Sequence, residues 1–286
     1  MLADFKSGFP TNIISKIESF IFCGDIGDPI YATELLEIVD YIKSNSASRI
    51  RVITNGSYKK AEWWQHLGSM LDYNDQVTFS VDGWNNDSNN QYRVNSDFDS
   101  IILGVKSLRA SSACLIQWST IYFAFNQDKI NDIKSLAKSL GCDRFQTVKS
   151  SKFDGRYLTD GVDVLKPTND YVSETLLYDI TVEDFKTTKY TPMPVLVPVT
   201  PHKWARCLNY KKDLFIGVDG LVSPCPWFNS GYQDNNFIKE NRSHLSIKNR
   251  SFFEIINDTA LWQKLKDSFD HDPLEICLLK CKNGQQ

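Results

Sequence analysis

Hydrophobic positions in the first half of the chain follow two alternating patterns. Short apolar runs rich in aromatic and β-branched residues, typical of buried strands, alternate with segments whose apolar residues recur at helical spacing. The predicted strands are 17–25, 49–56, 75–83, 113–125 and 144–151. The predicted helices are 34–44, 59–71, 98–111 and 128–141. Strands that alternate with helices of this length indicate an α/β fold with a parallel sheet or barrel.

Three of the predicted strands end in small and polar residues. These ends are Gly24-Asp25, Asn55-Gly56 and, after Ser80, Asp82-Gly83. Ligands bind at the carboxyl ends of the strands in such folds, so these residues are candidates for a ligand-facing rim. Asn-Gly and Asp-Gly are also good turn formers, so the same residues could have a purely structural role in turns and bind no ligand.

The predicted strand 113–125 carries polar residues on one face. Gln117 and Ser119 alternate along it and therefore point to the same side. If that side lines the inside of a barrel, Gln117 can contact a cofactor or substrate.

The alternation stops after residue 151, which divides the chain into three predicted regions. They are an α/β domain at 1–151, an irregular region with a proline-rich linker at 152–204, and a cysteine-containing domain at 205–286. The prolines between 190 and 204 exclude a helix or a central strand there. In the last region, Asp219-Gly220 separates two apolar runs and predicts a β-hairpin.

Composition narrows the class of protein. Hydrophobic residues make up 42% of the 286 residues, charged residues 23%, and the net charge is -3, which is typical of a globular protein. No apolar run is long enough to cross a membrane, and the N-terminus lacks the apolar core of a signal peptide. We therefore expect a cytoplasmic protein that binds neither nucleic acid nor membrane.

Four of the seven cysteines have a spacing that suits metal binding. Cys207 and Cys225 flank the predicted hairpin, and Cys277 and Cys281 stand one helical turn apart. Four thiolates from two separate segments suit structural zinc or an iron–sulfur cluster, although each cysteine could also be a small buried hydrophobe. The other three, which we expect to be core residues, are Cys23, Cys114 and Cys142.

Five segments, in this order, resemble the core of the radical S-adenosylmethionine (radical SAM) superfamily. They are FCGDIGDPIYATELLEIVDYIK, RVITNGS, VTFSVDG, YRVNSDFDSIILGVKSL and NQDKINDIKSLAKSLGCDRF. The C-terminal pattern C-x12-G-x4-C followed by C-x3-C resembles the twitch or SPASM extension of that superfamily. Together the resemblances cover about residues 17–150 and 205–282.

The resemblance implies a fold, two cofactors and a set of binding residues. The fold is a partial (β/α)6 TIM-like barrel that lacks its first strand and carries a small cysteine-rich extension. The cofactors are S-adenosylmethionine and one auxiliary 4Fe–4S cluster held by Cys207, Cys225, Cys277 and Cys281. The residues implied to line the S-adenosylmethionine site are Gly24, Asp25, Gly27, Asp28 and Pro29 at its methionine end, Asn55, Ser80 and Asp82 at its ribose and cluster side, Arg93 at a carboxylate, and Gln117.

One departure from the superfamily is large. Its C-x3-C-x2-C motif, which holds the cluster that cleaves S-adenosylmethionine, does not occur among these 286 residues. We expect the first strand and the cysteine loop to be missing, and without them the sulfonium bond is not cleaved.

Three functions follow from this departure. The chain is a radical SAM-like enzyme that modifies a peptide or small metabolite if the cluster segment is supplied, with a reductant such as flavodoxin or ferredoxin. Alternatively, it is an inactive relative that binds one 4Fe–4S cluster and acts as a scaffold. The third alternative is an α/β protein with structural zinc.

Overall fold

The computed structural model describes residues 2–24, 27–150, 153, 163–171, 173–177, 207, 214–228, 236–274, 277, 278 and 281. The chain divides into two compact units. One contains the sheet and its helices within residues 18–190, and the other combines residues 1–17 with residues from 191 onward. The proline-rich segment predicted to be a linker lies outside the described residues.

The first unit contains a six-stranded sheet whose strands follow one another in chain order. Its parallel strands are β1 (Ser19–Phe22), β2 (Arg49–Thr54), β3 (Gln76–Ser80), β4 (Leu115–Tyr122) and β5 (Arg144–Lys149). They confirm the five predicted strands and the α/β class. A short sixth strand, β6 (Thr175–Leu177), pairs antiparallel with β5 inside the region predicted to be irregular. It was missed because three residues are too few to show a hydrophobic period.

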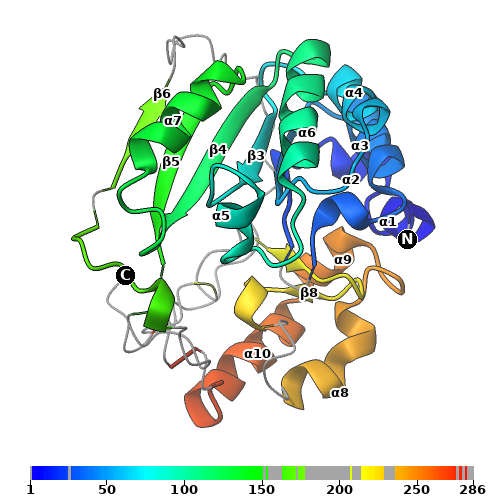
Figure 1. The fold of residues 1–286 in the computed structure, drawn as a ribbon. Coiled ribbons are helices and arrows are strands. Elements are labelled where there is room, and N and C mark those ends of the chain that lie inside the picture. Colours follow the sequence, from blue (N-terminus) through cyan, green and yellow to red (C-terminus); the bar gives the residue numbers. More distant parts are fainter. Residues whose placement is uncertain are drawn as a thin grey trace. The chain divides into compact units, whose positions relative to one another are not determined.

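Helices connect the parallel strands where the sequence predicts them. They are α3 (Leu35–Asn45), α4 (Ala61–Met70), α6 (Phe98–Ser111) and α7 (Ile130–Ser139). Along one side of the strands, α3, α4 and α6 stand together (Figure 1). A short helix, α5 (Asn86–Asn90), lies between β3 and α6, where the sequence pattern predicts neither a strand nor a helix. Asn85 starts it, because its side chain accepts the Ser88 N–H in a capping box.

The two faces of the sheet differ in chemistry. Large apolar side chains on one face, such as Val77, Phe79 and Trp118, are completely buried. Helices cover this face, since the Trp64 ring of α4 lies 5.1 Å from the Phe79 ring and the Phe98 ring of α6 lies 6.4 Å from the Trp118 ring. The opposite face carries polar side chains, and we call it the polar face.

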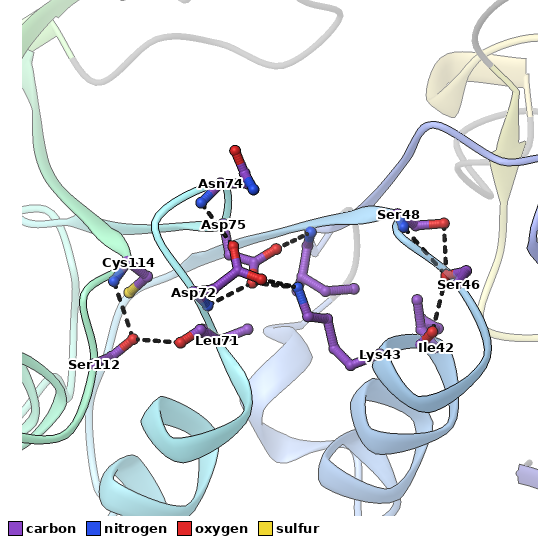
Figure 2. A network of polar contacts seen from close by, with 11 residues as sticks. Ile42, Lys43, Ser46, Ser48, Leu71, Asp72, Asn74, Asp75, Ser112 and Cys114 are labelled. Atoms are coloured by element: carbon purple, nitrogen blue, oxygen red, sulfur yellow. Dashed lines mark hydrogen bonds and ion pairs between the residues drawn. The ribbon is translucent and has the colours of Figure 1, made fainter. Parts of the chain in front are cut away.

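An ion-pair network anchors the amino-terminal ends of β2 and β3 (Figure 2). Lys43 of α3 places its Nζ 2.8 Å from both Asp72 and Asp75. The Asp75 carboxylate is fully buried and also accepts the backbone N–H groups of Ile50 and Asp72. Burial raises the pKa of Asp75, whereas Lys43 opposes this shift. The network ties one helix to two neighbouring strands.

Helices make up most of the described part of the second unit. Its elements are α1 (Leu2–Gly8), α2 (Thr11–Ile14), the hairpin strands β7 (Phe215–Ile216) and β8 (Val222–Ser223), the short turn η6 (Pro226–Phe228), and α8 (Asn236–Leu245), α9 (Phe252–Asn257) and α10 (Thr259–His271). The hairpin around Asp219-Gly220 is as predicted. No helix of the described residues is long and apolar enough to span a membrane.

The first residues of the chain pack in this second unit. The Phe9 ring lies 4.9 Å from that of Phe252, and a side chain at Gly8 would come within 2.8 Å of Ile247. The sequence pattern placed residues 1–16 with the sheet, whereas the structure groups them with the C-terminal third. Contacts between such distant segments leave no local signal in the sequence.

Candidate functional site

The loop after β1 is a tight turn built on two glycines. A side chain at Gly24 would lie 1.8 Å from the carbonyl oxygen of Gly27, so only glycine fits there. Gly27 itself has a φ of 98°, a conformation that other residues rarely adopt. Asp25 lies outside the described residues. The two glycines thus let the backbone turn back on itself at the strand end.

Asp28 joins this loop to the end of the next strand. Its Oδ2 accepts the backbone N–H of Asn55 at 2.6 Å, and its Oδ1 accepts that of Ile30 at 3.2 Å. Pro29 begins the short η1 (Pro29–Tyr31), whose amino end Asp28 caps. The carboxylate that the sequence singled out therefore holds two loops together at the strand ends.

Asn55 and Gly56 form the turn that their sequence predicts. The Asn55 side chain accepts the backbone N–H of Ser57 at 3.0 Å, and Gly56 has a φ of 78°. A side chain at Gly56 would meet the Phe79 ring at 2.7 Å. The turn alone is enough to account for an asparagine and a glycine at these two positions. The hydrogen bond from the Asn55 backbone to Asp28 also places Asn55 at the rim of the candidate site.

Asp82 and Arg93 form an ion pair at the end of β3. Arg93 Nε lies 2.7 Å from Asp82 Oδ2, and Asp82 Oδ1 accepts the backbone N–H of Ile121 at 2.6 Å. Burial raises the pKa of Asp82, and the nearby Arg93 charge opposes that shift. Because Asp82 is completely buried, its carboxylate contacts the Arg93 guanidinium and the backbone rather than solvent.

Two buried asparagines complete this rim, and the sequence analysis missed them as site residues. Asn89 accepts the backbone N–H groups of Asp82 and Gly83, and Asn126 donates to the carbonyl oxygens of Asp82 and Ile121. Both side chains are fully buried. An Asn in a polar loop is ordinarily a surface residue, so only tertiary contacts reveal these two.

An open pocket of about 440 Å³ lies at these strand ends. Hydroxyl, amide and guanidinium groups dominate its lining, and three tyrosines form its apolar walls. The lining residues are Tyr31, Asn55, Ser57, Tyr58, Tyr92, Arg93, Val94, Asn95 and Ser96. Tyr58 and Asn95 both have positive φ angles, and the Tyr58 hydroxyl donates to the Asn95 carbonyl. Such backbone strain concentrates at functional sites.

Gln117 and Ser80 lie on the polar face and are not among the residues that line this pocket. Gln117 is nearly buried, and its amide donates to Gln146 at 3.0 Å. The structure therefore brings Asn55 and Arg93 together in the pocket, with Asp28 and Asp82 behind them, but keeps Gln117 apart.

The four C-terminal cysteines influence one another electrostatically. A hydrogen bond to Cys225 and burial raise the pKa of Cys207, and the charges of Cys225, Cys281 and Cys277 raise it further. The hydrogen bond from Cys207 lowers the pKa of Cys225 to about 7, against burial and with help from the backbone N–H groups of Phe228 and Trp227. Burial raises the pKa of Cys277 to about 12. Thiols are the kind of donor that thiolate-preferring metals bind, although the described part of the structure does not gather three or more of these four into one metal site.

No group of three or more His, Cys, Asp or Glu that could hold a metal ion occurs among the described residues. Cys114 and Cys142 are buried in the first unit, as predicted for core residues, and Cys23 is exposed at the end of β1, which corrects its prediction as a core residue. Burial raises the pKa of Cys114 to about 11 and that of Cys142 to about 12.

The fold is similar to known structures. SuiB from Streptococcus suis aligns with 92% of this chain and 61% of its own, at a TM-score of 0.57 and 12% identity. The E. coli coproporphyrinogen III oxidase HemN, a radical SAM enzyme, aligns with 53% of this chain and 37% of its own, at a TM-score of 0.42 and 12% identity. TYW1 with a lysine-pyruvate adduct bound aligns with 48% and 43%, at a TM-score of 0.37 and 15% identity.

At these identities the similarity is one of fold. This chain spans less than two thirds of SuiB and less than half of HemN and TYW1. No protein-family model matches the chain, and no curated protein has a matching sequence.

Proposed function

We propose that this chain is a radical SAM-like iron–sulfur protein. It binds S-adenosylmethionine at the carboxyl ends of β1–β3 and an auxiliary 4Fe–4S cluster at Cys207, Cys225, Cys277 and Cys281. The observation that carries the proposal is the Arg93 guanidinium, fixed by a buried carboxylate at the wall of the strand-end pocket. The superfamily resemblance of the sequence and the SuiB-like fold support it.

The methionine end of S-adenosylmethionine carries a carboxylate and an amino group. Arg93 offers the carboxylate a charged donor, because its Nε is held by Asp82 and the residue lines the pocket. The glycine turn at Gly24 and Gly27 lets backbone carbonyl groups approach the amino group closely. Asn55 and Ser57 supply further polar groups at the same rim.

Cleavage of the sulfonium bond needs an electron from a cluster on three further cysteines. Since C-x3-C-x2-C does not occur in this chain, a segment outside it would supply those thiolates. The chain's own contribution is to bind and orient S-adenosylmethionine, and a peptide or small-metabolite substrate is modified beside it. A flavodoxin or ferredoxin would deliver the electron.

Isothermal titration with S-adenosylmethionine tests the cofactor site. Arg93→Ala should weaken binding about tenfold or more, the effect of losing one charge-assisted contact. Arg49→Ala is the matched control, since Arg49 is exposed and pairs with Glu18 at the sheet edge. Arg93→Lys, which keeps the charge opposite Asp82, distinguishes lost contact from lost folding. Wild-type protein that binds no S-adenosylmethionine would refute the proposed site.

Metal analysis tests the cluster and separates the alternatives. After anaerobic reconstitution with iron and sulfide, we expect iron and acid-labile sulfide in equal amounts, and loss of both in Cys225→Ser. Cys23→Ser is the control, because Cys23 belongs to the first unit. Zinc without acid-labile sulfide would favour the structural zinc protein. A cluster without binding of S-adenosylmethionine would favour the scaffold.

A further inference from the structure

The strands β1–β5 contribute hydrogen-bond donors and no carboxylates to the polar face. Strand register places Arg51, Gln76, Thr78, Gln117, Ser119, Arg144 and Gln146 on it, together with the apolar residues Ile53, Leu115, Ile121 and Val148. Branched apolar residues usually fill the interior face of such a sheet. None of the residues that β1–β5 contribute to this face is an aspartate or a glutamate. This composition favours an acceptor-rich, negatively charged ligand.

Three glutamines form a ladder across the middle strands of this face. Gln76 donates to Gln117 at 3.1 Å and to Thr78 at 2.8 Å, and Gln117 donates to Gln146 at 3.0 Å. Each hydrogen bond fixes the orientation of the next amide group, so the three glutamines form a rigid polar surface. Gln146 ends it on β5 and is half-buried.

One arginine lies near each end of the ladder, Arg51 on the strand before it and Arg144 on its last strand. Arg51 of β2 stands opposite Gln76 in the strand register and is exposed. Arg144 of β5 stands opposite Gln117 and is half-buried, and its buried Nε has no hydrogen-bond partner in the described part of the chain. A buried guanidinium nitrogen without an acceptor is costly unless a ligand supplies one.

We propose that the polar face binds an extended peptide segment with two acidic side chains, one at Arg51 and one at Arg144. Resting on the proposed function, this segment is part of the substrate. From β2 to β5 there are three strand spacings, about 14 Å. A peptide at about 3.3 Å per residue spans that distance with acidic residues about four positions apart, whereas the two carboxylates of a small dicarboxylate lie much closer together.

This surface is separate from the strand-end pocket. Arg51, Gln76 and Arg144 lie in the first half of their strands, whereas Asn55 and Arg93 follow the strand ends. Binding energy from a part of the substrate that does not react can orient the part that does. The two arginines would thus select an acidic segment and leave the chemistry at the rim unchanged.

Fluorescence anisotropy with the wild-type chain tests this proposal directly. The probe is a short fluorescein-labelled peptide with two glutamates about four residues apart, and its counterpart has glutamines instead. We expect the glutamate peptide to bind about tenfold more tightly, and Arg51→Gln and Arg144→Gln each to weaken it several-fold. Arg49→Gln is the matched control on the same strand and face, because Arg49 already pairs with Glu18.

Each other outcome overturns the proposal. If the two peptides bind equally, the negative charges of the glutamates do not contribute to binding. If Arg49→Gln weakens binding of the glutamate peptide as much as Arg51→Gln and Arg144→Gln do, the effect of the arginines is non-specific. Displacement of the peptide by millimolar succinate would identify a small dicarboxylate as the ligand. Circular dichroism confirms that each variant is folded. The measurement needs neither iron nor S-adenosylmethionine, so failure of the proposed function is seen separately in the titration with that cofactor.

Discussion

Arg93 and Asp82 are held together at the end of β3, with Nε and Oδ2 2.7 Å apart. They are eleven positions apart in the chain, and the loop between them contains α5. Asp82 is completely buried, while part of the Arg93 side chain is exposed at the pocket. The pair therefore has a buried end at Asp82 and an accessible end at the pocket.

Asp82→Asn should lower the free energy of unfolding by about 3 kcal/mol, because it leaves the Arg93 charge without a buried partner. Urea unfolding measures this change. In Asp82→Asn/Arg93→Met part of the stability should return, since no single charge is then left unpaired. A double variant as unstable as the sum of the two single ones would show that the residues do not interact.

Lys43→Met should destabilise the first unit by about 2 kcal/mol, because Asp75 then stays buried without its counter-charge. Lys129→Met is the control, since the Lys129–Asp132 pair is exposed and should contribute less than about 1 kcal/mol. Chemical denaturation of both variants gives the comparison. Equal losses would argue that the buried position of Asp75 has no energetic effect.

The same network predicts a dependence on alkaline pH. Burial alone would lower the pKa of Lys43, but its hydrogen bonds to Asp72 and Asp75 raise it above the usual 10.5. A raised folded-state pKa contributes stability that is complete below 10.5 and is lost as the pH rises through the folded value. The stability difference between wild type and Lys43→Met should therefore shrink above that range. Unfolding curves at several alkaline pH values would detect a difference that does not shrink.

Cys225 should react ahead of Cys142 when the metal-free protein is alkylated near neutral pH. Its pKa of about 7 leaves about half of it as thiolate there, whereas burial raises the pKa of Cys142 to about 12. Mass spectrometry after brief treatment with iodoacetamide locates the modified residue, and Cys142 is the internal control. Reconstitution with iron and sulfide should protect Cys225. Modification of Cys142 ahead of Cys225 would contradict the assignment of the reactive thiol.

Gly24→Ala should distort the loop after β1, because the added methyl group would lie 1.8 Å from the Gly27 carbonyl oxygen. We expect a loss of about 1–3 kcal/mol in stability and weaker binding of S-adenosylmethionine. Gly141→Ala is the control, since Gly141 has a positive φ at which alanine is strained, and it lies at the turn between α7 and β5. It should lower stability and leave binding unchanged. If Gly24→Ala binds S-adenosylmethionine as tightly as the wild type, this loop is not part of the proposed binding site.

The α/β alternation, the parallel strands and the hairpin at Asp219-Gly220 were predictable from the sequence. Strand and helix periods are local, and turn residues such as Asn55-Gly56 act on their own backbone. The polar alternation of Gln117 and Ser119 likewise predicted that they share a face, as the register shows. The three-residue β6 and the five-residue α5 were too short to leave such a pattern.

Only the tertiary structure decided which residues meet. Asp28 reaches Asn55 and Arg93 reaches Asp82 because parallel strands bring their carboxyl ends to one edge, and no local period encodes a contact between two loops. The glutamine ladder depends on the register of three strands, and the packing of Phe9 on Phe252 joins the two ends of the chain. Sequence determined the elements by short-range physics, whereas the site arose from long-range packing and buried charge.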